Sequence, residues 1–166
     1  MPYLTFFVSF DESSVEIDDF QKLVEASPNL YHLAVNYKFL QPLFDNETLC
    51  YLLQHRITHL LISISRSTSL QTVADSISCI SSMFSRLKHF YFHQTSSTEP
   101  TEILILSVLK HLPNWTSLIS FGVANAKMGS EPVSKGIRQW VIENSLLNDE
   151  DSFLTDYSDD TFRLWL

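Results

Sequence analysis

A short apolar pattern recurs along this chain at nearly constant intervals. The pattern, apolar-x-x-apolar-x-apolar, begins at Tyr3, Leu30, Ile57 and Leu87, and a weaker copy begins at Trp115. The intervals between these starts are 27, 27, 30 and 28 residues. A period of this size is typical of solenoid proteins, in which each unit buries its apolar side only against its neighbours. The repeat therefore predicts a solenoid and argues against an enzyme.

Each repeat contains a strand-like segment followed by a helix-like one. The strand-like segments are rich in β-branched and aromatic residues. They are Tyr3–Phe10, Tyr31–Tyr37, Thr58–Ile64, Lys88–Gln94 and Thr116–Val123. Between them, apolar residues spaced by three and four indicate amphipathic helices, most clearly from Leu70 to Phe84. Because strand–helix–strand units this short form right-handed crossovers, we expect an α/β fold with parallel strands on one face and helices on the other.

Three segments of the sequence resemble leucine-rich repeats: Pro28–Val35, Phe84–Phe92 and Pro113–Leu118. They are similar to the long, irregular, helix-containing repeats that follow the F-box in F-box proteins, and the similarity covers residues 3–125. The resemblance implies a leucine-rich-repeat solenoid. It departs from the family where a polar Asn or Cys is usual after the last apolar position. Those slots hold Asp11, Lys38, Ser65, Thr95 and Val123.

The period ends near residue 129, which divides the chain into two predicted parts. Residues 1–129 form the solenoid of about five strand–helix units, and residues 130–166 form a C-terminal capping segment. Within the latter we expect a helix over Val133–Leu146 and an antiparallel pair made by Phe153–Tyr157 and Phe162–Leu166. Solenoid ends need such covers because the last repeat would otherwise expose its apolar side.

Aligning the repeats predicts that outward side chains stack into columns, because strand side chains alternate between faces. The third position holds Thr5, His32, His59, His89 and Ser117; the fifth holds Phe7, Ala34, Leu61, Tyr91 and Ile119; the seventh holds Ser9, Asn36, Ser63, His93 and Phe121. His32, His59 and His89 should therefore form a ladder. It is open to four interpretations: tolerated half-apolar residues, a partner contact, a zinc site or a pH sensor.

The fifth column contains more apolar residues than a surface that only contacts solvent usually has. An apolar strip on a solenoid is either covered by other chain or is a recognition surface. We predict a protein-binding site on this face, with Tyr91 and Phe121 as its best anchors because aromatic residues dominate interface energy. The candidate residues are Phe7, His32, His59, Leu61, His89, Tyr91, His93, Ile119 and Phe121.

Composition excludes several other classes of ligand. The formal net charge is −8, with the acids concentrated towards both ends, whereas a nucleic-acid surface needs clustered lysines and arginines. No apolar run approaches the roughly 20 residues of a membrane helix, and residues 1–10 lack the basic segment of a signal peptide. We interpret Cys50 and Cys79 as buried thiols on helices in a reducing compartment. We expect neither nucleic acid nor membrane as partner, and a cytoplasmic location, with the nucleus as the alternative.

Catalytic and cofactor-binding motifs are missing from the sequence. It contains only three glycines, and no Gly-rich phosphate loop, Gly-x-Ser-x-Gly elbow, His-Glu-x-x-His helix or Cys-x-x-Cys pair. We therefore expect no enzyme activity, no cofactor and no bound metal.

The function we predict is protein recognition through the strand-lined face. The resemblance implies the substrate-binding repeat domain of an F-box ubiquitin-ligase receptor. No F-box is found in this sequence, so contact with a Skp-type adaptor would require an F-box upstream in a longer product. Two alternatives stay open: a free-standing leucine-rich-repeat scaffold without a ligase role, and a small α/β enzyme.

Overall fold

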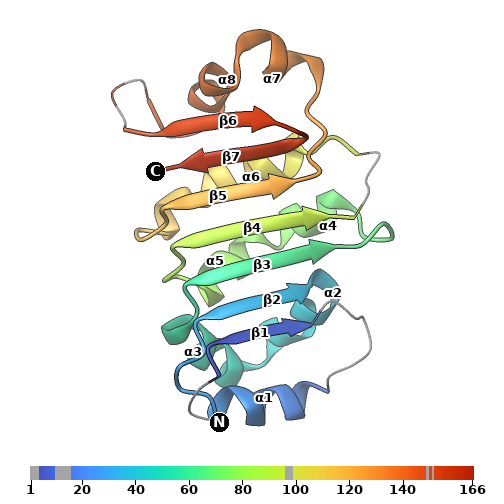
Figure 1. Ribbon diagram of the computed structural model, residues 1–166, viewed down its shortest axis with the longest axis vertical. Helices are drawn as coiled ribbons and strands as arrows, with labels where there is room; N and C mark the ends of the chain where they lie inside the picture. Colours follow the sequence, from blue (N-terminus) through green and yellow to red (C-terminus); the bar gives the residue numbers. More distant parts are fainter. Residues whose placement is uncertain (1–3, 10–15, 96–98, 149, 151) are drawn as a thin grey trace.

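The computed structural model describes residues 4–9, 16–95, 99–148, 150 and 152–166. Within these residues seven strands form one sheet in the order β1-β2-β3-β4-β5-β7-β6 (Figure 1). The strands are β1 (Phe6–Ser9), β2 (His32–Asn36), β3 (His59–Ile64), β4 (His89–Gln94), β5 (Ser120–Ala124), β6 (Leu154–Ser158) and β7 (Thr161–Trp165). Strands β1 to β5 are parallel, whereas β7 is antiparallel to both β5 and β6. The prediction of an α/β fold with parallel strands is confirmed.

The helices connect successive strands and lie on one side of the sheet; Figure 1 draws α3 to α6 behind the strands. The helices are α1 (Ile17–Glu25), α2 (Tyr37–Leu40), α3 (Glu47–Arg56), α4 (Leu70–Asp75), α5 (Ile77–Met83), α6 (Glu102–His111), α7 (Ser130–Lys135) and α8 (Ile137–Asn144), with 3-10 turns η1 (Gln41–Asp45) and η2 (Leu112–Asn114). Helix α1 continues this layer, since it packs on α3 and its Phe20 ring lies 5.0 Å from that of Phe7.

The core lies between the sheet and the helices, and β4 shows most clearly how alternating side chains build it. In β4, Phe90 and Phe92 are buried, whereas Tyr91 and His93 between and after them are exposed. The Phe90 ring contacts the rings of Phe92, Trp115 and Phe121 at centroid distances of 4.7, 5.3 and 5.8 Å. The opposite face of the sheet therefore carries only the side chains that point away from the helices.

The predicted register is confirmed for the three central strands. His32 pairs with His59 and His59 with His89, and the same spacing brings Leu61 beside Tyr91. These pairings follow from intervals of 27 and 30 residues, which equal the predicted ones. The repeat therefore locates β2, β3 and β4 correctly relative to one another.

The predicted register is wrong for β5, and Phe121 faces the core instead of solvent. Phe121 pairs with Phe90 and is fully buried. The cause is Trp115, which does not begin a strand: its backbone N–H donates to the Leu112 carbonyl, and its indole Nε1 donates to the Phe84 carbonyl at 3.1 Å. The apolar pattern in fact restarts at Leu118, three residues later. Ile119 precedes β5 and is exposed.

The register of β1 is wrong by one residue, and Phe7 also faces the core. Phe6 rather than Thr5 pairs with His32, so Phe7 pairs with the buried Leu33. The inward positions of β1 are therefore Phe7 and Ser9 rather than Phe6 and Val8, and this register places the Phe7 ring against Phe20. The ends of the predicted strand, Tyr3 and Phe10, lie outside the described residues.

The C-terminal antiparallel pair is confirmed as the hairpin β6–β7. Its turn residues Asp159 and Asp160 have φ of 49° and 52°, the left-handed values that a two-residue turn matched to strand twist requires. Strand β7 pairs with β5, so the hairpin extends the same sheet. The single predicted helix over 133–146 is instead two helices, because Gly136 adopts a φ of 85° between α7 and α8.

We predict that Phe90→Ala and Tyr91→Ala differ sharply in stability although the residues are neighbours. Phe90→Ala should lower the free energy of unfolding by about 3–5 kcal/mol, because it leaves a cavity among three aromatic rings. Tyr91→Ala should cost less than about 1.5 kcal/mol, since its side chain is on the exposed face. Urea unfolding followed by tryptophan fluorescence measures both. Equal losses would contradict the assignment of the two faces.

Candidate functional site

The face of the sheet away from the helices, here called the open face, carries two long rows of side chains. The strand register sets both rows. The first is Phe6, His32, His59, His89, Ser120, Trp165 and Leu154, and the second is Val8, Ala34, Leu61, Tyr91, Gly122, Arg163 and Asp156. Parallel sheets are usually covered on both faces. In the described part of the chain, helices α1 and α3 to α6 cover the other face only.

The predicted histidine ladder is present in the first row. The imidazoles of His32 and His59 stack at 5.5 Å with an interplanar angle of 22°, and those of His59 and His89 lie 4.5 Å apart at 36°. The Phe6 ring meets His32 edge-on at 4.1 Å. At the other end, His89 Nδ1 lies 2.8 Å from Ser120 Oγ. The ladder is thus a continuous aromatic row that ends in a hydrogen bond.

The ladder lies in an environment that favours neutral imidazole. Partial burial, together with the neighbouring His59, lowers the pKa of His32 below its usual value. Partial burial also lowers the pKa of His59, and the nearby His89 and Lys88 lower it further. Strands β1 to β5 contain no Asp or Glu. On the open face Asp156 is paired with Arg163 at 2.9 Å.

A shallow pocket of about 310 Å³ opens over the ladder. Its walls include His32, His59, His89, Leu61 and Tyr91. The Tyr91 ring lies across β5, where a Cβ on Gly122 would come within 2.6 Å of Tyr91 Cε1. The glycine therefore allows Tyr91 to form a low wall of this pocket.

The zinc interpretation of the ladder finds no ligand set. Among the described residues no group of three His, Cys, Asp or Glu side chains is arranged to hold a metal ion. The pH-sensor and partner-contact interpretations remain predictions.

The structure brings six of the nine predicted site residues together on β2, β3 and β4. They are His32, His59, Leu61, His89, Tyr91 and His93. Ile119 precedes β5 and is exposed, whereas Phe7 packs against the core and Phe121 lies within it. In their place, Phe6 and Val8 occupy the outward positions of β1, and each is 45% exposed. The sequence pattern carries no signal for this, because Tyr3, Phe6 and Val8 fit it, whereas Leu4, Phe7 and the polar Ser9 do not.

Trp165 and Arg163 also belong to the open face, and the sequence analysis missed both. The side chain of Trp165 is 37% exposed and extends the histidine row beyond Ser120. Its position depends on the antiparallel pairing of β7 with β5, which brings the end of the chain beside residue 120. The repeat carries no signal for this pairing.

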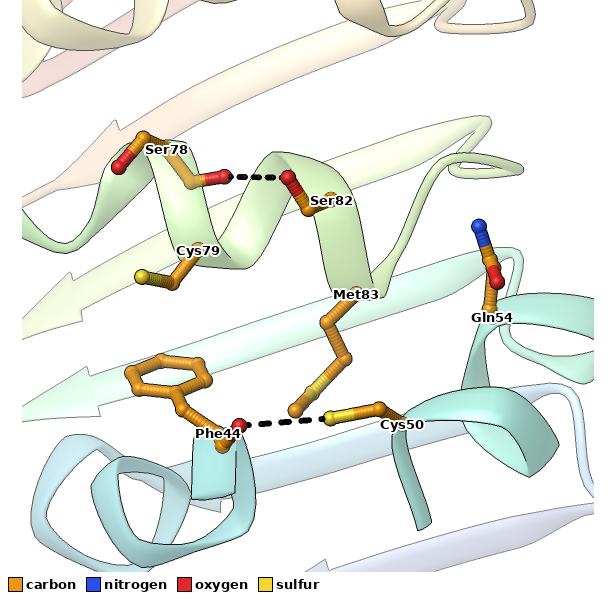
Figure 2. Close-up of a pocket in the computed structure, with 7 residues that line it drawn as sticks. All are labelled: Phe44, Cys50, Gln54, Ser78, Cys79, Ser82 and Met83. Carbon is orange, nitrogen blue, oxygen red and sulfur yellow. Dashed lines mark hydrogen bonds between the residues drawn. The ribbon is translucent and has the colours of Figure 1, made fainter. Parts of the chain in front are cut away.

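A second pocket lies on the helical side, and Figure 2 shows its residues on η1, α3 and α5. It has a volume of about 350 Å³, and both cysteines line it. Cys50 Sγ donates to the Leu43 carbonyl at 3.4 Å, and burial raises the pKa of this thiol. A protonated thiol is a poor nucleophile. The prediction that both thiols are buried is wrong for Cys79, which is exposed.

Comparison of the chain with family models, with curated proteins and with solved structures finds no match. The resemblance to the repeats of F-box proteins is thus neither supported nor excluded by relatives, and it stays a prediction. Within the described residues, no helix combines the length and the apolar composition needed to cross a membrane. The function is therefore argued from the open face and its side chains.

We predict that the two cysteines react with thiol reagents at different rates. Cys79 is exposed on α5, whereas Cys50 is partly buried and its pKa is raised. A maleimide should therefore modify Cys79 at least about tenfold faster, because the thiolate is the reacting form. Mass spectrometry of Cys50→Ser and Cys79→Ser proteins measures each rate separately. Equal rates in the folded protein would contradict this.

We predict that the ladder makes stability depend on pH. The pKa values of His32 and His59 are lowered in the folded protein. At a pH between the folded and the unfolded pKa values, the unfolded chain therefore binds more protons than the folded chain. The free energy of unfolding should therefore fall as pH drops below about 6.5 and level off below the folded values.

The variant His59→Gln should reduce this pH dependence, because it removes one titrating ring. The control is His55→Gln on α3, an exposed histidine outside the sheet. Urea unfolding at several pH values provides the measurement, and NMR titration of the ring protons reports the midpoints. Identical slopes for the two variants would contradict a role for the ladder.

Proposed function

We propose that this chain is a protein-recognition module without enzyme activity, and that its partner binds the open face. The observation that carries the proposal is the set of exposed aromatic and apolar side chains in the two rows of the open face, on a mostly parallel sheet that the described helices cover on one face only. Phe6, Val8, Tyr91 and Trp165 are each between 36% and 45% exposed. Leaving such a strip in water is unfavourable, and covering it with a partner would recover that free energy.

The side chains of the open face suit binding better than chemistry. Tyr91 and Trp165 are rigid and combine an apolar ring with a polar atom, the composition typical of interface hot spots. The pocket over the ladder is about 310 Å³, enough for individual partner side chains. Tyr91 forms one of its walls and is the anchor we assign.

The fold is compatible with the leucine-rich-repeat interpretation, which we keep as part of the proposal. With the observed register, the equivalent starting positions of the repeats are Leu4, Leu30, Ile57, Leu87 and Leu118, at intervals of 26, 27, 30 and 31 residues, and Ser9 takes the last apolar position of the first copy. Each interval spans one parallel strand and its helical connection. Irregular lengths of this kind suit the helix-containing repeats of F-box proteins.

Under this interpretation the chain would act as the substrate-binding repeat domain of a ubiquitin-ligase receptor in the cytoplasm or nucleus. A Skp-type adaptor would then bind an F-box encoded upstream. A free-standing scaffold is the alternative, and sequencing the transcript upstream of Met1 separates the two. An in-frame F-box favours the receptor, and an in-frame stop codon favours the scaffold.

We predict that Tyr91→Ala and Phe6→Ala weaken partner binding while the fold is retained. Quantitative affinity purification compares these variants with Tyr51→Ala, which alters an exposed tyrosine on α3. A protein that both open-face variants lose and Tyr51→Ala retains is then purified for calorimetry. Its Kd should rise at least about tenfold with Tyr91→Ala, as expected for an aromatic hot spot.

The opposite pattern would place recognition elsewhere. A partner that survives both open-face variants but is lost with Tyr51→Ala would assign binding to the helical side. Circular dichroism of each variant confirms that the comparison is made between folded proteins.

A further inference from the structure

We propose that the histidine ladder recognises carboxylate side chains, so that the open face takes an acidic segment of the partner protein and holds it by protonated imidazole. This inference rests on the proposed function, because it names the chemistry of the partner at the same face. Three features of the ladder support it: ring nitrogens without a hydrogen-bond partner among the described residues, the charge around them, and the pocket above them.

Hydrogen bonds occupy Nδ1 of two of the three ladder rings. His59 Nδ1 lies 3.0 Å from Thr58 Oγ1, and His89 Nδ1 lies 2.8 Å from Ser120 Oγ. Among the described residues, the Nε2 atoms of these two rings have no hydrogen-bond partner. An imidazole with Nδ1 occupied and Nε2 free is ready to donate to an oxygen, and more strongly when it is protonated.

The charges on the open face are complementary to a carboxylate. Strands β1 to β5 contain no acidic residue, although the chain as a whole carries a formal charge of −8. On β6 and β7, Asp156 is paired with Arg163. The titratable groups that face the ladder from the packed strands are Tyr31, Lys88, Tyr91, His93 and Arg163. None of these is a carboxylate, so among the described residues the ladder has no acidic neighbour of its own to pair with, and a partner carboxylate can take that place.

The pocket gives that carboxylate an apolar neighbour. Leu61 and Tyr91 line it together with the three ladder histidines. A charge-assisted hydrogen bond is stronger beside apolar walls, because less water competes for the donor. The segment that fits best therefore has acidic residues next to apolar or aromatic ones.

The free and bound states differ in protonation, and this difference sets the sign of the pH effect. In the free protein, partial burial and neighbouring imidazoles lower the pKa of His32 and of His59, which disfavours the cation of both rings. A bound carboxylate favours the cation, so binding takes up a proton. Affinity should therefore be highest below the pKa of the free ladder and should be lost as pH rises through the pKa of the complex.

The test uses two synthetic fluorescein-labelled peptides that share the same leucine and tryptophan residues. One peptide interleaves them with glutamate and the other with glutamine. The glutamate peptide should bind at least about tenfold more tightly near pH 5.5 than near pH 8, one pKa unit of coupling, whereas the glutamine peptide changes less than about twofold. Fluorescence anisotropy gives the Kd values, and amide NMR shifts map the binding surface.

Matched variants assign the effect to the ladder. His59→Gln and His89→Gln should abolish the pH dependence for the glutamate peptide, while His55→Gln on α3 should preserve it. Glutamate-peptide binding that keeps its pH dependence in both ladder variants would overturn the proposal, and so would the absence of binding by either peptide.

The remaining outcomes separate this proposal from the proposed function. If both peptides bind the open face equally at both pH values, acid recognition is overturned while recognition at the open face stands. If sedimentation shows self-association of the free chain that Tyr91→Ala removes, the open face belongs to a second copy and the acidic partner is overturned. If the purified partner binds the Tyr91→Ala protein as tightly as the unchanged protein, by contrast, the result counts against the proposed function itself.

Discussion

The packing of one inward row of side chains across the sheet determines most of this structure. The row runs Phe7, Leu33, Leu60, Phe90, Phe121 and Leu164, one residue from each of six neighbouring strands. Because side chains alternate along a strand, a slip of one residue would turn this whole set towards solvent. The row therefore sets the register, and the register in turn decides which residues form the open face. The histidine ladder is the direct consequence, since it lies one position before the row on three consecutive strands.

The two faces of the sheet meet different physical demands. On the helical face, large apolar rings exclude water and supply stability. On the open face, the imidazoles contact one another ring to ring, and Tyr91 and Trp165 add partly exposed aromatic rings that tolerate water. Such a surface costs less free energy in the unbound protein than a row of leucines and can still bury apolar area when a partner arrives. This combination is the physical basis for assigning recognition to the open face.

The C-terminal hairpin extends the sheet beyond β5 and adds side chains to the open face. Strand β7 pairs with β5, which would otherwise present an unpaired edge. Its inward Phe162 and Leu164 continue the core, while its outward Trp165 and Arg163 extend the two exposed rows. A segment that the repeat analysis treats only as a cap therefore contributes directly to the surface on which binding is proposed.

The sequence by itself determined the α/β character, the central strands and the outward side chains of β2, β3 and β4. It could do so because apolar spacing reports burial directly and the intervals there match the register. Only the tertiary structure decided that Phe7 and Phe121 are core, that Phe6 replaces Phe7 outside, and that Trp165 joins the first row. The connections between the strands differ in length, which shifts the register of β1 and β5. Trp115 is buried with its indole bonded to the Phe84 carbonyl, and Trp165 reaches the first row through pairing between strands distant in sequence. A local pattern contains none of this, because a residue's face is fixed by its partner strand as well as by its own neighbours.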